Sequence, residues 1–182
     1  EAVQSILDQS FGDFEFLIVD DGSTDATPEL LAATARRDDR VRLVRQERNQ
    51  GIVAALNRGL ALCRGRYIVR MDADDVALPE RLERQTALLE RDPGIGVLGA
   101  AVEYIDPGGR PLGVTRRCRP DRSPLRENPM LHPTVAIRAE LLRREGLRYQ
   151  ERFRFAEDYF LWLQLSRLGR LAALDEVLVR YR

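Results

Sequence analysis

Residues 66–75, RYIVRMDADD, decide the fold of this chain, because an apolar segment runs directly into three carboxylates. Residues 67–71 have the apolar, β-branched content of a buried strand, and Asp72, Asp74 and Asp75 follow at its end. Carboxylate oxygens suit Mg²⁺ or Mn²⁺, and an Asp-x-Asp pair leaves coordination positions open for substrate phosphates. The pattern predicts a strand end that holds a hard cation. A solvated acidic turn is the alternative for the motif taken alone.

Two further acidic clusters support a functional site. Residues 14–25, FEFLIVDDGSTD, are also a strand that runs into carboxylates, and Glu157 and Asp158 open an apolar helical stretch. In a parallel α/β sheet, ligands bind beyond the carboxyl ends of the strands, so Asp20 and Asp21 should lie on the same rim as the 72–75 cluster. The three clusters therefore predict one cleft.

The chain alternates between helical and strand patterns. Helical spacing covers residues 1–9, 27–37, 50–64 and 79–91, and strand patterns cover residues 15–19, 41–45 and 67–71. This rhythm predicts a parallel sheet flanked by helices. The strand pattern of residues 95–105, followed by the turn at residues 106–109, predicts a hairpin and hence a second half of mixed strand direction. Residues 116–128, rich in Arg and Pro, are expected to form a long loop, either a lid or acceptor-binding segment or a disordered excursion.

Composition and charge exclude several classes of protein. The 182 residues are 44% hydrophobic, which suffices for the core of one domain. With 29 basic and 29 acidic residues the formal charge is zero, so no global field favours nucleic acid as a partner. The longest apolar stretch, residues 95–102, is far shorter than the about 20 residues of a membrane-spanning helix. Two cysteines, Cys63 and Cys118, and one histidine support neither a disulfide scaffold nor a zinc site.

The motifs follow one another in a specific order. They are DDGSTD at residues 20–25, N-x-G at 49–51 with Asn57 and Gly59, GRYIVRMDADD at 65–75, HPT at 132–134 and EDY at 157–159. Together they resemble the inverting glycosyltransferases of family 2, and the resemblance runs over nearly all of the chain. It implies one catalytic domain over residues 1–182 with a GT-A fold, in which a Rossmann-like, mostly parallel central sheet is flanked by helices and the second half is mixed or antiparallel. Residues 1–92 would form the nucleotide-sugar-binding half and residues 93–182 the acceptor-binding half.

The resemblance also implies roles on the donor side. Asp74 matches the carboxylate that binds Mg²⁺ or Mn²⁺, with Asp72 as co-ligand or ribose contact, and the ion would act as a Lewis acid on the leaving diphosphate. Asp21 matches the carboxylate that reads the base of the nucleotide. Gly51 permits close approach of the backbone to the ligand, or serves only the turn between strand and helix.

On the acceptor side, Asp158 corresponds to the general base that deprotonates the attacking hydroxyl. One displacement inverts the configuration, so no second nucleophilic carboxylate is needed. Glu157 would position the acceptor or orient Asp158, with a helix-start acid favoured by the dipole as the structural alternative. His132 and Asp75 are expected at the diphosphate or the acceptor, and for a lone histidine a structural role is the alternative.

The implied partners are a nucleotide-diphosphate-sugar donor and a saccharide or lipid-linked acceptor. The family most often implies bacterial cell-surface or exopolysaccharide synthesis. No signal-peptide pattern or transmembrane segment is visible. The expected location is therefore the cytoplasm, or the inner face of the membrane through peripheral association.

One departure from the family leaves alternatives open. Family members begin with a strand that ends in a proline-containing nucleotide loop, whereas the pattern here starts one helix later, at Glu1. We expect a domain without its first strand, with an unpaired edge that an intermolecular contact, such as a homo-oligomer, would cover. The first rival function is a catalytically silent domain that binds a nucleotide-sugar or a partner. The second is a nucleotidyltransferase, which would normally need a Gly-rich loop with a basic residue near its start.

Overall fold

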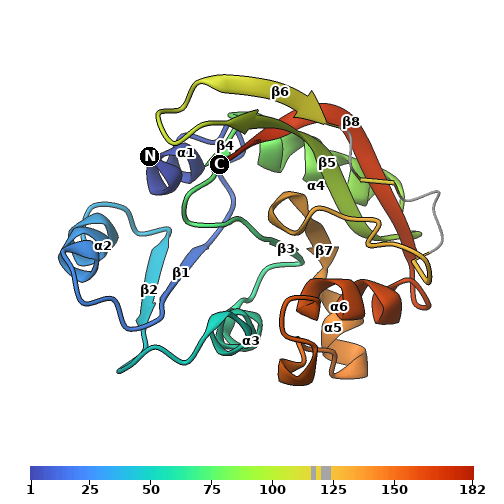
Figure 1. Ribbon diagram of the computed structural model, residues 1–182, viewed down its shortest axis with the longest axis horizontal. Helices are drawn as coiled ribbons and strands as arrows, with labels where there is room; N and C mark the ends of the chain where they lie inside the picture. The colour runs from blue at the N-terminus through green and yellow to red at the C-terminus, as the bar shows by residue number, and fades with distance from the viewer. Residues whose placement is uncertain (116–117, 120–123) are drawn as a thin grey trace.

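The structure is a computed structural model that describes residues 1–115, 118–119 and 124–182 (Figure 1). Its helices are α1 Ala2–Leu7, α2 Thr27–Ala35, α3 Ile52–Leu62, α4 Arg81–Arg91, α5 Ala139–Glu145 and α6 Glu157–Leu165, with short 3₁₀ turns η1 His132–Thr134 and η2 Glu151–Phe153. Its strands are β1 Phe16–Asp20, β2 Val41–Arg45, β3 Tyr67–Val69, β4 Val76–Ala77, β5 Ile95–Ile105, β6 Pro111–Thr115, β7 Ala136–Arg138 and β8 Arg170–Tyr181. Within these described ranges, no helix is long and apolar enough to cross a membrane.

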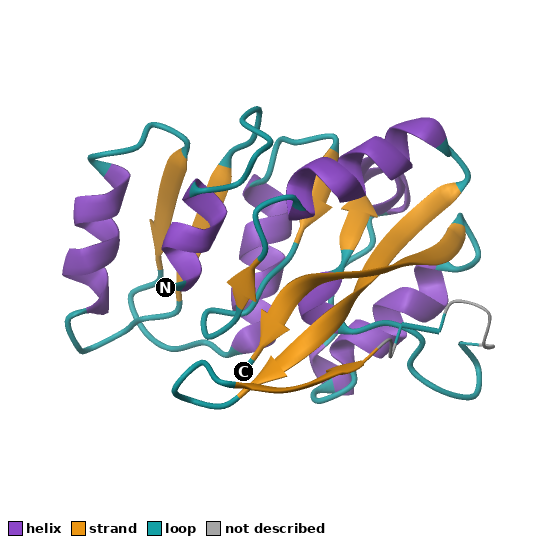
Figure 2. Cartoon of the chain, turned by 90° about the horizontal axis from the view of Figure 1, so that it is seen from above, coloured by secondary structure: helices purple, strands orange, loops and turns teal. Residues whose placement is uncertain are grey.

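The strands form two sheets. β1 and β2 pair in parallel as a two-stranded sheet, and the second sheet has the order β3-β7-β5-β8-β4, with β6 paired to β5. In the second sheet β5 runs parallel to β8 and antiparallel to β6 and β7. The long strands β5 and β8 lie side by side, with helices around the sheets (Figure 2). The predicted α/β class, the hairpin after residue 105 and the mixed second half are thus confirmed.

The core lies on both faces of β5, which explains why residues 95–102 read as a continuous apolar run rather than an alternating one. Successive side chains of a strand point to opposite faces. Val97 packs in a cluster with Trp162 of α6, whereas Leu98 packs in a second cluster with Leu89 of α4. The sheet therefore sits between α6 and α4.

Some element boundaries differ from the predicted ones. Helix α2 begins at Thr27 as predicted and ends at Ala35, two residues before the predicted end; Asp25 accepts the Thr27 N–H at 2.9 Å. β3 ends at Val69, two residues before the predicted end. β4, β7 and β8 were not predicted; β4 is only two residues long, and the pairing of β8 with β5 shifts register, so its burial does not alternate cleanly.

A buried arginine on α4 joins two segments that carry predicted motifs. Arg81 donates from Nη2 to the carbonyl oxygens of Arg70, 2.7 Å away, and Pro133, 2.8 Å away. Its Nε donates to Gln85, which in turn donates to the carbonyl oxygen of Thr134 at 2.8 Å. One face of α4 therefore holds the end of β3 and the HPT turn in register.

The positive charge of Arg81 is partly compensated by the carboxylate of Asp75. Burial lowers the pKa of Arg81 to about 9, and the carboxylate of Asp75 opposes this shift. Within the described residues, Nη1 of Arg81 and Oδ2 of Asp75 are both buried without a hydrogen-bond partner. Because isolated buried charges are unfavourable, the carboxylate of Asp75 stabilises the charged form of Arg81. Burial raises the pKa of Asp75 itself to about 6.

Arg81→Leu should lower the free energy of unfolding by about 3–5 kcal/mol, because it removes the donors that bind the carbonyl oxygens of Arg70 and Pro133. Urea denaturation at neutral pH measures the difference. Arg84→Leu is the matched control: Arg84 lies on the same helix, exposed, and pairs with Glu176 at 3.5 Å, so the loss should stay below about 1 kcal/mol. Equal losses in the two variants would contradict this reading of Arg81.

Candidate functional site

A cleft of about 320 Å³ opens where several elements meet. The start of α3, the segment after β3, the HPT turn, the start of α6 and the end of β8 all contribute to it. Its lining residues are Ile52, Arg70, Asp72, Asn128, Met130, Leu131, His132, Pro133, Phe155, Glu157, Asp158 and Tyr181. Four of the predicted site residues, Asp72, His132, Glu157 and Asp158, are therefore brought together from distant parts of the sequence.

Asp158 is the second residue of α6, and its carboxylate is fixed from two sides. Oδ2 accepts a hydrogen bond from Nδ2 of Asn128 at 2.9 Å, and Oδ1 accepts the N–H of Tyr159 at 2.6 Å. Burial raises the pKa of Asp158, and the hydrogen bond from Asn128 acts in the opposite direction. Asp158 is thus an oriented and partly desolvated carboxylate.

Glu157, the first residue of α6, differs from its neighbour. Its side chain is buried, and among the described residues its Oε2 atom has no hydrogen-bond partner. Glu157 also lines the cleft, although its Oε2 atom is itself buried.

Arg70 and Asp72 form an ion pair at the centre of the lining. Nη1 of Arg70 donates to Oδ2 of Asp72 at 2.7 Å, and Nη2 donates to Oδ1, so the contact is bidentate. The Arg70 side chain is only 11% exposed, which holds a fixed positive charge inside the cleft. The carboxylate of Asp72 is thereby bound within the protein.

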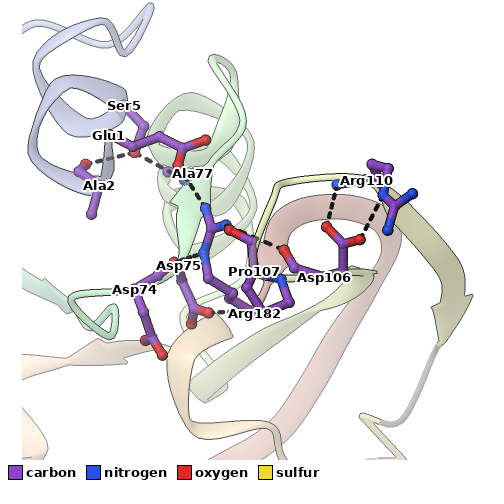
Figure 3. Close-up of polar contacts among 10 residues, drawn as sticks. All are labelled: Glu1, Ala2, Ser5, Asp74, Asp75, Ala77, Asp106, Pro107, Arg110 and Arg182. Carbon is purple, nitrogen blue, oxygen red and sulfur yellow. Dashed lines mark hydrogen bonds and ion pairs between the residues drawn. The ribbon is translucent and has the colours of Figure 1, made fainter.

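Asp74 and Asp75 lie in the turn after Asp72, beside Arg182 (Figure 3). The Arg182 N–H donates to Oδ1 of Asp75 at 3.0 Å, and its Nε donates to the carbonyl oxygen of Asp74 at 2.8 Å. Asp75 is fully buried and does not line the cleft, so the expected contact with diphosphate or acceptor does not follow from its position. No dashed contact reaches the carboxylate of Asp74 in Figure 3.

The predicted metal site has two candidate ligands, the carboxylates of Asp72 and Asp74. In the ranges that the structure describes, no three His, Cys, Asp or Glu side chains gather closely enough to hold an ion. Asp72 is bound by Arg70, whereas the carboxylate of Asp74 accepts no hydrogen bond from the described residues. The hard oxygen donors fit Mg²⁺ or Mn²⁺ chemically, with substrate oxygens completing the coordination.

The ring of His132 is hydrogen-bonded to the side chain of Tyr149. Its Nε2 lies 2.8 Å from the hydroxyl of Tyr149, and its ring packs edge-on against Trp162, with 5.8 Å between centroids. Asn57 fixes the backbone of Tyr149 through two hydrogen bonds, of 3.0 and 2.9 Å. Burial lowers the pKa of His132 well below its ordinary value, and the charge of Arg70 acts in the same direction. His132 therefore presents a neutral ring to the cleft.

Asp21 and Gly51 lie together but outside the cleft lining. Oδ1 and Oδ2 of Asp21 accept the N–H groups of Gln50 and Gly51, each at 2.8 Å. Gly51 has φ of 89°, in the left-handed region that favours glycine, and starts α3 as its N-cap. The next residue, Ile52, does line the cleft. Asp21 thus organises the turn that leads into the site, and its predicted contact with the base stays a prediction.

Three residues that line the cleft were not predicted from the sequence: Arg70, Asn128 and Phe155. A charged residue inside the apolar run of residues 67–71 was a signal for Arg70. Asn128 ends the segment predicted as a long loop, of which residues 116–117 and 120–123 lie outside the described part of the chain. Phe155 had no sequence signal beyond its closeness to Asp158.

The sequence has close parallels among known proteins. Residues 1–147 match the model of the family described as Glycosyl transferase family 2. An uncharacterized glycosyltransferase of Haemophilus influenzae is 33% identical over 197 residues, covering 100% of this chain and 60% of that protein. The amylovoran biosynthesis glycosyltransferase AmsE of Erwinia amylovora is 32% identical over 193 residues, covering 100% of this chain and 69% of that protein. The chain thus spans about two thirds of the length of these curated relatives.

Solved structures share the fold. Residues 1–349 of TarS from S. aureus, in complex with UDP, superpose with a TM-score of 0.83 at 24% identity, covering 99% of this chain and 55% of that one. The mannosyltransferase PcManGT of Pyrobaculum calidifontis, in complex with GDP-Man and Mn²⁺, gives a TM-score of 0.72 at 22% identity, covering 96% and 49%. The family resemblance and the expected GT-A fold are confirmed.

The single histidine allows a direct test of the site's electrostatics. Because burial depresses the folded-state pKa of His132 below the ordinary value of 6.5, its stabilising contribution is present above pH 6.5 and is lost as pH falls through the folded pKa. A proton NMR titration of the His132 ring should give a midpoint below 6.5 in the folded protein and near 6.5 in urea. A folded-state midpoint at or above the value in urea would refute a desolvated, neutral ring.

Proposed function

The chain belongs to glycosyl transferase family 2, and we propose that it transfers a sugar from a nucleotide-diphosphate donor to a hydroxyl acceptor, with inversion at the anomeric carbon. The observation that carries the proposal is the partly desolvated carboxylate of Asp158, held by Asn128 in a cleft that also contains the guanidinium of Arg70. A positioned base and a fixed cation in one cleft are what such a displacement requires.

Asp158 acts as the general base. Burial raises its pKa, which makes the carboxylate a stronger base toward the acceptor hydroxyl. Asn128 holds the carboxylate in orientation, so that it removes the proton as the acceptor oxygen attacks the anomeric carbon. A single displacement with one base inverts the configuration, whereas the retaining route of glycosidases needs a second carboxylate as nucleophile.

Arg70 neutralises negative charge on the leaving diphosphate. Its planar guanidinium offers donors in the geometry that phosphate oxygens match, and its pairing with Asp72 keeps it oriented before a donor binds. His132 contacts the diphosphate or the acceptor as a neutral ring. Glu157, which lines the cleft beside Asp158, positions the acceptor or orients Asp158.

A divalent ion, Mg²⁺ or Mn²⁺, would be held by Asp74, with Asp72 as co-ligand or ribose contact. Bound there, it would supply Lewis-acid stabilisation of the departing diphosphate. Two observations support this part of the proposal: the carboxylate of Asp74 is not engaged by the described residues, and the similar PcManGT structure contains Mn²⁺.

The donor and acceptor are assigned to the two halves of the chain. Residues 1–92, with Asp21 and Gly51 at the entry to α3, bind the nucleotide; residues 93–182, with Asp158, bind the acceptor. The acceptor is a saccharide or a lipid-linked saccharide of cell-surface or exopolysaccharide synthesis, at the cytoplasmic face of the membrane. The similarity to an amylovoran biosynthesis glycosyltransferase supports this role.

Asp158→Asn should reduce sugar transfer by about 10²- to 10⁴-fold, the usual contribution of a positioned base, while donor binding is retained. Release of nucleoside diphosphate in the presence of acceptor measures transfer, and calorimetric titration measures donor binding. Glu176→Gln, on β8 and exposed, is the control and should match the wild type. Unchanged turnover in Asp158→Asn removes Asp158 from this role, and donor binding by a wild-type protein without transfer favours the silent-domain alternative.

Asp74→Ala should abolish the part of nucleotide binding that depends on the ion, because the variant lacks the available carboxylate. Calorimetric titration of nucleotide with and without Mn²⁺ measures this difference. Asp39→Ala removes an exposed carboxylate between α2 and β2 and serves as the charge-matched control. If Asp74→Ala keeps the same Mn²⁺ dependence as Asp39→Ala, the metal assignment is wrong.

A further inference from the structure

Phe155 combines two unfavourable features at the edge of the cleft. Its φ of 72° lies in the left-handed region, and among the described residues it is the one non-glycine residue with positive φ. Its side chain is 90% exposed, although it is large and apolar. Strained backbone and exposed aromatic surface both oppose folding, and their combination is typical of residues that are kept for binding.

The neighbouring aromatic residues show that exposure is particular to Phe155. Phe153 and Phe160 stack on each other with 4.0 Å between ring centroids, so they shelter one another from water. Phe155 follows Phe153 by two residues but is not part of this ring pair, and it lines the cleft instead. The left-handed backbone at Phe155 therefore separates its ring from the local apolar cluster.

One side of the Phe155 ring is already occupied. The guanidinium carbon of Arg154 lies 5.2 Å from the ring centroid, in cation–π geometry, which orients the ring. A single cation covers one face of the ring, so the other remains for a ligand. Ile52, which is 47% exposed, is a further apolar side chain of the lining, as are Met130 and Leu131.

We propose that Phe155 forms the acceptor subsite by stacking its ring on the C–H face of a pyranose. The face of an aromatic ring carries negative charge density, and the C–H groups of a sugar are polarised positively by their oxygens, so stacking adds electrostatic attraction to the burial of apolar surface. Phe155 lies two residues before α6, which carries the base Asp158, and both residues line the same cleft, which places the subsite on the acceptor side. The inference rests on the proposed function and names its acceptor class as a pyranoside.

Saturation-transfer NMR with the methyl glycosides of glucose, galactose and mannose tests this subsite. The wild-type protein should give signals at the C–H protons of at least one pyranoside. Phe155→Ala should weaken the affinity for that pyranoside by roughly 3- to 10-fold, the worth of one aromatic contact, and Phe155→Trp should restore it. Leu30→Ala, which removes an exposed apolar side chain from α2 outside the cleft, is the matched control.

A stability measurement separates binding from folding. Because the side chain of Phe155 is exposed, Phe155→Ala should melt at the wild-type temperature. Phe155→Gly should melt at or above that temperature, because glycine adopts φ of 72° without strain, yet it should bind the pyranoside as weakly as Phe155→Ala. If Phe155 served only the fold, a substitution would not weaken pyranoside binding while leaving the melting temperature unchanged.

Two results would overturn the inference: the same pyranoside affinity in Phe155→Ala as in the wild type, or no pyranoside signal from a wild-type protein that binds a nucleotide. The pyranoside series is also recorded without nucleotide. Failure of every nucleotide to bind would contradict the proposed function, while the comparison between the Phe155 variants would still decide whether the ring contacts a sugar.

Discussion

The buried guanidinium of Arg81 is the interaction on which the arrangement of the cleft depends. It binds the carbonyl oxygens of Arg70 and Pro133, which belong to segments more than sixty residues apart, and thereby holds the end of β3 against the HPT turn. A charged group without exposure is tolerated only where it is hydrogen-bonded and compensated, and Asp75 supplies the opposite charge. The last acidic residue of the motif thus contributes to the fold, whereas Asp72 lines the cleft.

Charge inside the cleft is organised around Arg70. Its guanidinium pairs with Asp72, and its charge also opposes protonation of His132 and the raised pKa of Asp158. In the proposed function, the fixed cation of Arg70 would bind the diphosphate, and the partly desolvated carboxylate of Asp158 would remove the proton. The low exposure of Arg70 is what makes its charge effective, because screening by water is reduced there.

The sequence was sufficient to predict the helices, strands and turns that depend on residues close together in the chain. The apolar strand before Asp72, the turn after residue 105 and the helix that begins at Glu157 all follow from periodicity and turn chemistry. Long-range pairing could not be predicted, so β4 and β8 were missed. The cleft itself was predicted only in part, because Asn128 reaches it from a segment without periodicity. Asp21 accepts a hydrogen bond from the Gly51 N–H, a contact that the spacing of the motifs does not indicate.

The measurement that tests the account most directly is the thermal stability of the protein against UDP, GDP, dTDP and CDP, each with and without Mn²⁺. A ligand that binds only the folded state raises stability by an amount set by its concentration relative to Kd. The account predicts that one nucleotide raises the melting temperature and that Mn²⁺ increases the shift, because Arg70 and the carboxylates act on the same diphosphate. If no nucleotide raises the melting temperature, either with or without Mn²⁺, the account is contradicted.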